Sequence, residues 1–269
     1  MRRTRKTAAL LAGAAVLGWN TSAADGPQPE VFDTVVIDAG HGGEDEGARG
    51  PRGRYEKAIV LDVARQLAMD LRAQGLRVVM TRRDDVFVAL EERTNIANDA
   101  KADLFISIHA NSARDEDVRG AETFYLSLDA SDESARQVAL RENRAFEGQR
   151  GGVRPSDDPL LTIIGGLLEN QHIRLAAEFS KLAQNRLAEL QPEHARGVKQ
   201  APFVVLMGVR MPATLVEIGF MTHGEEEQRL ASARGQGEIS AALVKAVLDF
   251  QRNFDRRHGS SAAALGDGR

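Results

Sequence analysis

Residues 35–43, with the sequence VVIDAGHGG, decide how the surrounding chain can fold. Three β-branched residues run directly into Asp38, and a turn that contains His41 and three glycines follows. A buried strand that ends in a glycine-rich turn, with one histidine at its carboxyl end, is typical of an α/β active site. For this segment alone, a tight strand-to-helix turn with an incidental histidine remains an equal alternative.

Strands and helices alternate along most of the chain. Apolar spacing predicts strands near 34–38, 76–81, 104–108, 121–126, 203–206 and 213–218, and helices near 55–74, 89–100, 172–190 and 237–254. This alternation indicates the α/β class, because it suits a parallel sheet that is covered on both faces. We predict a single three-layer α/β/α domain at residues 34–255, with a mostly parallel sheet of about six strands. Its ligand would lie beyond the carboxyl ends of the strands.

Residues 1–23 have the pattern of a secretory signal peptide, and residues 24–33 have that of a linker. A basic head precedes an apolar run that is too short to cross a membrane, and small residues follow it. The pair Arg2 and Arg3 leaves both general (Sec) and twin-arginine (Tat) export open. We expect an exported, periplasmic protein without a transmembrane segment, and a monomer.

The charge argues against nucleic-acid binding, and the absence of cysteine excludes disulfides and thiolate metal ligands. Removing residues 1–23 takes away four positive charges and changes the formal charge from −4 to −8. Nucleic-acid binding depends on clustered Lys and Arg, so it is not expected here. The chain has no cysteine, so it has no disulfides, and any metal must be bound by His, Asp or Glu.

The alternation of strands and helices breaks at residues 129–169. Residues 131–147 are charged and favour a helix, residues 148–159 form a flexible link, and residues 160–169 are strongly apolar. Long inserted segments in compact domains are usually functional or mobile. The small, polar tail at 256–269 predicts disorder.

Two histidines and two glutamates are predicted to meet at one edge of the sheet. His41 and His109 each follow a strand, Glu217 lies within an apolar strand, and Glu56 begins a helix. Two His and one Glu without cysteine suit a catalytic Zn²⁺, which keeps its fourth position for water. We assign His41, Glu56 and His109 to the metal, and Glu217 to proton transfer as the catalytic residue.

Each of these residues also has a purely structural interpretation. His109 could bond to backbone at a strand end, and Glu56 could favour the positive end of a helix dipole. Glu217 fits such an interpretation least, because an apolar strand rarely buries an unpaired carboxylate. Asp38 either orients a metal ligand or only shapes the turn.

Four ordered motifs then point to a family. They are DAGHGG at 38–43, YEK at 55–57, SIHANS at 107–112 and VEIGF at 216–220. Together they resemble the zinc-dependent N-acetylmuramoyl-L-alanine amidases of bacterial cell-wall turnover, over about residues 34–254. The resemblance implies a sheet of about six strands flanked by helices, in agreement with the alternation above. It also implies that His41, Glu56 and His109 bind zinc and that Glu217 is the catalytic glutamate. The implied reaction hydrolyses the amide between the lactyl group of N-acetylmuramic acid and L-alanine in peptidoglycan.

Family members that act at the division septum often carry a segment that blocks the site until an activator protein binds. The insertion at 129–169 lies where such a segment would be, which implies cell-wall remodelling and daughter-cell separation. We hypothesise that its first helix covers the zinc and that Glu142 completes the coordination, with Glu133 and Glu147 as alternatives. The apolar helix at 160–168 would be the activator's docking surface. The alternative is a lid that packs on the domain without inhibiting it.

Two other functions stay open at this point. A non-catalytic wall-binding module of the same fold would be expected to lack one of the four site residues, and none is missing. A different exported zinc hydrolase, such as a peptidase or deacetylase, is excluded only by the ordered motifs. Asn111 and Arg93 are weak candidates for glycan recognition because they lie near the site in sequence.

Overall fold

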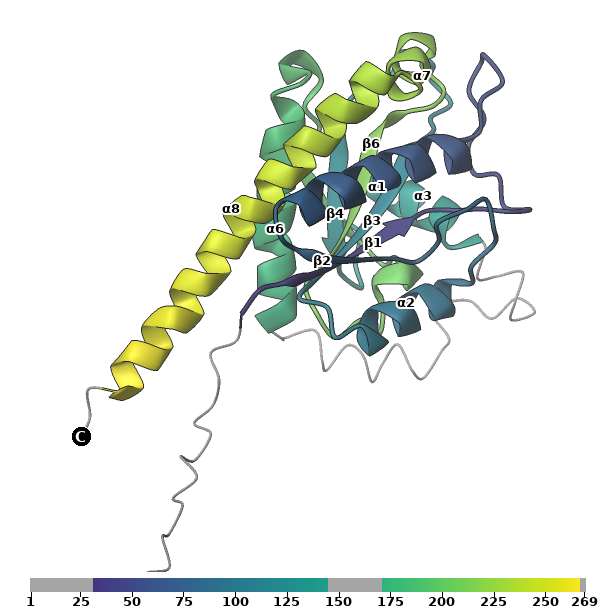
Figure 1. Ribbon diagram of the computed structural model, residues 1–269. Helices are drawn as coiled ribbons and strands as arrows, with labels where there is room; N and C mark the ends of the chain where they lie inside the picture. The colour runs from purple at the N-terminus through teal and green to yellow at the C-terminus, as the bar shows by residue number, and fades with distance from the viewer. Residues whose placement is uncertain (1–30, 145–170, 267–269) are drawn as a thin grey trace, which may run out of the picture.

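The computed structural model describes residues 31–144 and 171–266, and the side chains as far as 257. One sheet of six strands forms the middle layer, in the order β2-β1-β3-β6-β4-β5 (Figure 1). Its strands are β1 (Thr34–Ala39), β2 (Arg77–Met80), β3 (Leu104–Asn111), β4 (Glu122–Leu126), β5 (Val198–Ala201) and β6 (Ala213–Phe220). The pairing of β4 with β6 is antiparallel and the other pairings are parallel, which confirms the predicted mostly parallel α/β fold.

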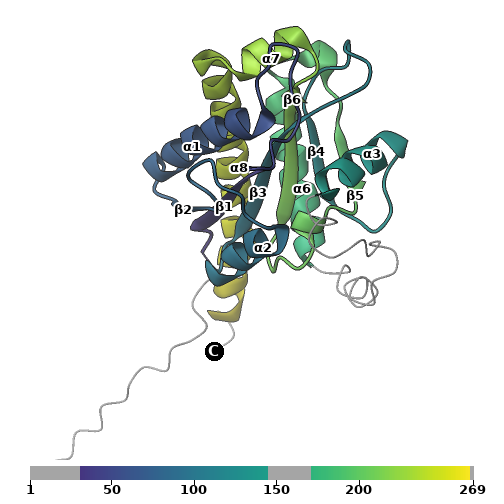
Figure 2. The same ribbon diagram turned by 90° about the vertical axis from the view of Figure 1, so that its right-hand side faces the viewer.

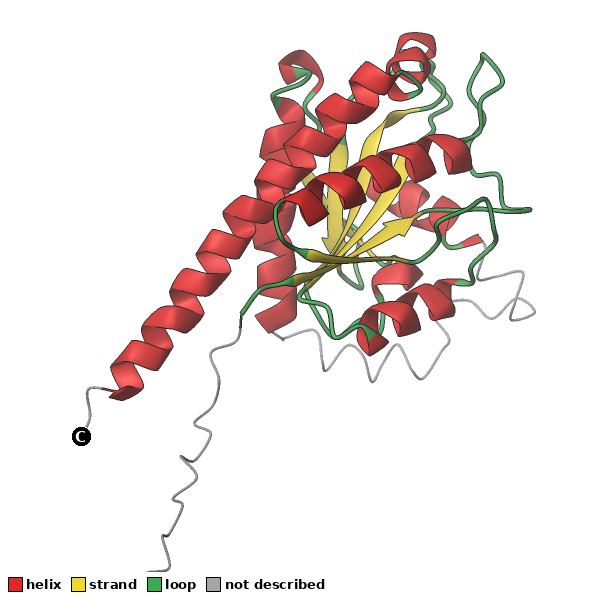
Figure 3. Cartoon of the chain, viewed as in Figure 1, coloured by secondary structure: helices red, strands yellow, loops and turns green. Residues whose placement is uncertain are grey.

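Helices cover both faces of the sheet. They are α1 (Glu56–Ala73), α2 (Leu90–Asp99), α3 (Glu133–Glu142), α6 (Gln171–Ala188), α7 (Gly224–Leu230) and α8 (Ala233–Gly266), with 3-10 turns η2 (Pro192–His194) and η3 (Val204–Leu206). Helices α1, α6 and α8 form one core with the sheet, and α2, α3 and η3 form the other. Figure 2 shows α2 and α3 on the near side of the sheet and α6 and α8 behind it, and Figure 3 shows the strands between the two helical layers.

The local sequence explains the first strand and helix. All six residues of β1 are buried, which is why its sequence is a β-branched run rather than an alternation. The buried positions of α1 include Val60, Val63 and Leu67, at the helical spacing that predicted them. Gly75 follows the helix with φ +88°, a conformation that glycine adopts at low cost.

The predicted strand at 203–206 is wrong. The edge strand is β5, which ends at Ala201, and residues 204–206 form the turn η3. Pro202 has no backbone N–H and cannot continue a sheet ladder. The side chains of Phe203, Val205 and Leu206 are buried against the α2 side of the molecule, which explains their apolar character.

Helix α8 extends into the tail at 256–269, for which the sequence predicts disorder. Helix α8 begins at Ala233, earlier than expected, and continues to Gly266. The residues Ala262, Ala263 and Ala264 are of the type with the highest intrinsic helix propensity, which favours helix in this part of the tail. The predicted signal peptide at 1–23, most of the predicted linker, residues 145–170 with Glu147, and the last three residues lie outside the described residues. Within the described ranges, no helix combines the length and apolarity needed to cross a membrane.

Candidate metal centre

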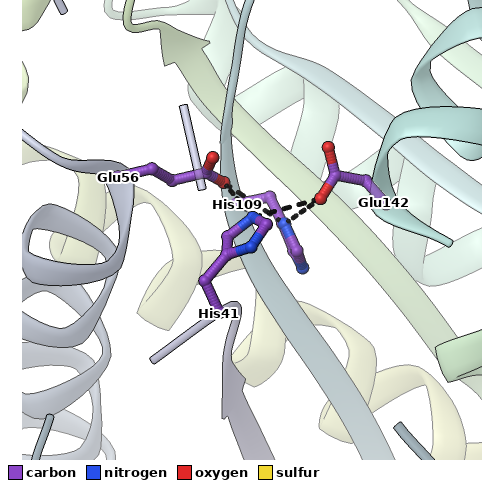
Figure 4. A group of neighbouring side chains, drawn as sticks. All are labelled: His41, Glu56, His109 and Glu142. Atoms are coloured by element: carbon purple, nitrogen blue, oxygen red, sulfur yellow. Dashed lines mark ion pairs between the residues drawn. The ribbon is translucent and has the colours of Figure 1, made fainter. Parts of the chain in front are cut away.

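Three structural elements bring His41, Glu56 and His109 together at the carboxyl edge of the sheet (Figure 4). His41 follows β1, His109 lies in β3, and Glu56 is the first residue of α1. Oε1 of Glu56 lies 3.1 Å from Nε2 of His41 and 3.3 Å from Nδ1 of His109. The two histidines and the glutamate proposed from the sequence as ligands therefore face a common point.

Glu142, at the end of α3, faces the same point from the opposite side. Its Oε2 lies 2.9 Å from Nδ1 of His109 and 3.2 Å from Nε2 of His41. The four candidate ligand atoms all lie within 4.8 Å of one another. Tetrahedral zinc with ligand bonds of about 2.0–2.2 Å keeps its donor atoms about 3.4 Å apart, so the spacing suits such an ion. Glu133, the first residue of α3, bonds instead to Arg136 at the surface.

The donor atoms fit a metal ion by a second criterion. Nε2 of His41, Nδ1 of His109 and Oε2 of Glu142 are shielded from solvent, yet none makes a hydrogen bond of acceptable geometry within the described residues. Buried polar atoms are nearly always satisfied, so three that converge on one point indicate a missing partner. A cation that accepts lone pairs from all of them would satisfy the group.

The electrostatics of the cluster reflect an excess of negative charge. Burial lowers the pKa of His109, but the carboxylate of Glu142 outweighs it and the pKa rises to about 10. Burial also opposes protonation of His41, and the charge of Glu56 raises its pKa well above the usual value. Burial alone would raise the pKa of Glu142. The positive charge of His109 opposes this effect and outweighs it, so the pKa falls to about 2. Without a metal the two imidazoles therefore hold the protons that balance the carboxylates.

Asp45 orients His41, and the sequence analysis missed it. Both carboxylate oxygens of Asp45 lie 3.0 Å from Nδ1 of His41, so Nε2 is the nitrogen that faces the cluster. A carboxylate on the far nitrogen of a ligating histidine fixes the tautomer and the ring orientation. The available signal was an acidic residue four positions after His41 in the same loop.

Gly40 gives His109 its room. A Cβ atom at Gly40 would lie 2.4 Å from Cε1 of His109, closer than side chains approach. The glycine therefore allows the ring to pack against the turn after β1, with Nδ1 toward the cluster. This is the structural reason for at least one of the glycines in the opening motif.

Buried arginines hold the turn that carries His41. Arg93 donates from Nη1 to Oδ1 of Asp38 at 2.8 Å, and from Nη2 to the carbonyl oxygen of His41 at 2.8 Å. Arg82 donates to the carbonyl oxygens of Ala39 and Gly40. Asp38 thus acts on the site through Arg93 and the backbone. With the Arg93 side chain 2% exposed, the suggestion that Arg93 recognises glycan is wrong.

Asn111 is also buried, and it contacts the helix that covers the site. Its Oδ1 accepts a hydrogen bond from Nη2 of Arg141 at 2.5 Å. Arg141 precedes Glu142, so this bond helps to hold α3 over the cluster. The position does not support direct glycan contact by Asn111 while α3 is in place.

Glu217 lies beside the cluster with its charge unpaired. It pairs in register with His109 on the neighbouring strand, and it is fully buried. Neither carboxylate oxygen has a hydrogen-bond partner among the described residues. Burial raises its pKa well above the usual value, and the charge of Glu142 adds to the effect. A carboxyl group that can hold a proton near neutral pH suits general acid–base chemistry.

The loop before Glu56 is held by the backbone and by a distant carboxylate. Glu56 accepts hydrogen bonds from the backbone N–H groups of Ala48 and Ala110, at 2.8 and 2.9 Å. Glu227 of α7 is completely buried and accepts from the N–H groups of Arg52 and Arg54. Sequence reasoning missed Glu227, because nothing in a run of three glutamates shows which of them are buried.

The imidazoles and carboxylates of this centre could bind a metal ion, and Glu217 lies beside them. An α/β fold with such a centre is typical of a hydrolase. Comparison with known proteins makes the assignment specific. Residues 35–249 match the family described as N-acetylmuramoyl-L-alanine amidase, and the chain belongs to this family. It is therefore an amidase of peptidoglycan, with a place in cell-wall remodelling.

Individual relatives agree with the family. The amidase AmiA of Escherichia coli K12 is 35% identical over 228 residues, which cover 84% of this chain and 79% of the relative. AmiC of Escherichia coli O6:H1 is 32% identical, and the match covers 85% of this chain and 56% of that protein. Among solved structures, AmiC2 of Nostoc punctiforme is similar with a TM-score of 0.62 at 29% identity, covering 82% of this chain and 97% of that one.

Proposed function

We propose that this amidase is a zinc enzyme that cleaves the amide between the lactyl group of N-acetylmuramic acid and L-alanine. His41, Glu56 and His109 would hold Zn²⁺, and the unsatisfied donor atoms that converge at their meeting point carry the proposal. When bound, zinc polarises the carbonyl and lowers the pKa of water to about 7. The sequence of residues 1–23 supports export to the periplasm, and daughter-cell separation is the proposed setting.

Glu217 would move the proton. It would take a proton from the attacking water and pass it to the nitrogen of L-alanine as the carbon–nitrogen bond breaks. The products are then a free lactyl carboxylate and a free amino terminus. The burial that raises the pKa of Glu217 keeps the transferred proton on the enzyme between these two steps.

Helix α3 would inhibit the enzyme directly. The carboxylate of Glu142 would take the position that the water nucleophile needs, and its charge helps to raise the pKa of Glu217. Departure of α3 would therefore open the metal and also lower the pKa of Glu217 toward the range in which it can act as a base. Both effects favour activity in the open state.

Neighbouring residues hold α3 in its inhibitory place. Arg141 donates to Asn111, as described above. Asn143 donates from Nδ2 to the carbonyl oxygen of Pro202 at 2.8 Å and accepts from the backbone N–H of Val204 at 2.9 Å. Release requires these bonds to break together, which is a task for a partner. We propose an activator protein that docks on the apolar residues 160–168, which lie outside the described part of the chain.

The experiment that tests the reaction uses purified cell wall, added zinc and the full chain carrying Glu142→Gln, so that the site is open without an activator. We expect new L-alanine amino termini without new reducing sugars, and no product when Glu217→Gln is added to this variant. New amino termini at other residues would indicate a peptidase, and new glucosamine amines would indicate a deacetylase. Either result would contradict the proposed amidase.

A further inference from the structure

A second hollow, which we call the side pocket, lies next to the metal centre and has a volume of about 380 Å³. It is lined by Arg49, Gly50, Pro51, Gly53, Ala113, Arg114, Glu116 and Thr222. The hollow at the metal centre is lined by Ala48 and Ser112, among others. Arg49 directly follows Ala48 and Ala113 directly follows Ser112, so the linings of the two hollows are neighbours in the chain at two points.

The side pocket presents two arginines that have no carboxylate partner among the described residues. Arg49 and Arg114 are exposed, and within the described residues no carboxylate forms an ion pair with either. The guanidinium carbon of Arg49 lies 5.5 Å from the ring centre of Tyr55, which limits where the side chain can go. Glu116 is the acidic residue in the lining, so the pocket keeps a positive charge.

Both walls of the side pocket are fixed by specific bonds. On one side, the buried carboxylate of Glu227 holds Arg52 and Arg54, at 2.8 and 3.1 Å from their N–H groups. A Cβ atom at Gly50 would lie 2.3 Å from this carboxylate, so the hairpin packs directly on it. On the other side, Ala113 donates its N–H to Oγ1 of Thr222 at 3.1 Å.

Such a wall is costly to build. Burying a carboxylate is unfavourable unless its hydrogen bonds compensate, and here those bonds go to an exposed hairpin that contributes little to the core. The buried carboxylate of Glu227 thus holds the surface loop around Arg52 and Arg54 in one conformation. A loop fixed in this way presents Arg49 in a defined place beside the metal centre.

We propose that the side pocket binds a carboxylate of the peptide on the nitrogen side of the scissile amide. The inference rests on the proposed function and adds the orientation of the substrate across the metal. The sugar side of that amide is uncharged, whereas an acidic peptide carries free carboxylates that a pair of guanidinium groups binds well. The N–H of Ala48 contacts Glu56, so Arg49 begins about one residue, or 3.8 Å, further along the chain. A carboxylate on the second residue of the peptide lies about 7–10 Å from the cleaved bond, within reach of the Arg49 side chain.

Helix α3 contributes no residue to the lining of the side pocket, although it covers the metal centre. Peptide binding can therefore be measured on the full chain without any activator. This separates the inference from the inhibitory role proposed for α3.

The test is titration, at low ionic strength, of a tripeptide with L-alanine first and a free carboxylate on its second residue. Wild type should bind it at least about tenfold more tightly than the same peptide with that carboxylate amidated. The double variant Arg49→Gln, Arg114→Gln should bind both peptides as weakly as wild type binds the amide. The matched control Arg210→Gln changes an exposed arginine that precedes β6, at the other end of the sheet, and should behave as wild type.

Equal binding of the two peptides by wild type, or no binding of either, would overturn the inference. So would a double variant that still prefers the acid while its melting temperature is unchanged. Cell-wall digestion by the same variants distinguishes this failure from failure of the proposed function. Each variant is digested in a Glu142→Gln background, which opens the site without an activator. If this open enzyme releases L-alanine termini and the double arginine variant leaves KM unchanged, only the side-pocket inference is wrong. If the open enzyme releases none, the proposed function is wrong.

Discussion

Oε2 of Glu142 lies 2.9 Å from Nδ1 of His109, which places a carboxylate of α3 on a histidine of the central strand β3. The two residues belong to segments with opposite roles. His109 is part of the edge where ligands of α/β proteins bind, and Glu142 ends a helix of the insertion. Their contact brings a carboxylate of the insertion into the candidate metal centre.

Glu142→Gln should raise the activity of the full chain without an activator. The substitution keeps the shape of the side chain but removes the charge that binds the two histidines. Removing one partner of a buried ion pair costs about 3–5 kcal/mol, so the open form should increase by about 10-fold or more. Release of dye from labelled peptidoglycan measures it. Glu133→Gln, an exposed glutamate on the same helix, should have no effect, and equal rates for the two variants would contradict autoinhibition by Glu142.

Glu217→Gln should abolish most turnover while zinc binding and the fold are kept. Loss of a general acid–base group costs about 10²–10⁴-fold in rate. The variant should also differ in stability, because folding raises the pKa of Glu217. A raised carboxyl pKa is a penalty that is absent below the unfolded pKa and grows as pH rises above it. The melting temperature of metal-free Glu217→Gln should therefore exceed that of wild type at pH 8 and approach it near pH 4. A constant difference would mean that Glu217 is not buried in its acid form.

Zinc should stabilise the protein more at high pH than at low pH. Folding raises the pKa of both histidines, to about 10 for His109. In metal-free protein this contribution is complete below the unfolded pKa of about 6.5, and it is lost as pH rises through the folded pKa. Zinc binds neutral imidazole, so protons also compete with it at low pH. The difference in melting temperature between zinc-loaded and chelated protein should grow from pH 6 to pH 9. A difference that shrinks over this range would show that these histidines do not bind the metal.

The sheet and the residues that meet in the candidate metal centre were predictable because their signals are local. A β-branched run before a glycine turn indicates a buried strand, and the parallel arrangement then brings His41 and His109 to one edge. The carboxylate of Glu217 stood out because an apolar strand seldom carries one. The position of Glu142 was only a hypothesis from a resemblance, since the sequence does not show where an inserted helix packs.

The elements that sequence analysis missed depend on tertiary contacts. Strand β5 has the polar sequence VKQA because it is an edge strand, and the apolar residues after Pro202 pack elsewhere. Arg93 looks like an ordinary exposed arginine in the sequence. It is buried because Asp38 and backbone carbonyls accept hydrogen bonds from its guanidinium group. Which polar residues are buried is decided by partners that lie far along the chain.

Asp45→Ala should weaken zinc binding without changing the ligands themselves. Both oxygens of Asp45 hold Nδ1 of His41, and without them the ring can rotate or present the wrong nitrogen. Loss of such a partner typically lowers metal affinity by about 10–100-fold. Competition with a chromophoric chelator measures the affinity, and circular dichroism checks that the fold is kept. Glu46→Gln is the matched control, because Glu46 is an exposed acid in the same loop and its side chain has no described contact with His41. If both variants lose zinc equally, the effect is the general charge of the loop and the orienting role of Asp45 is wrong.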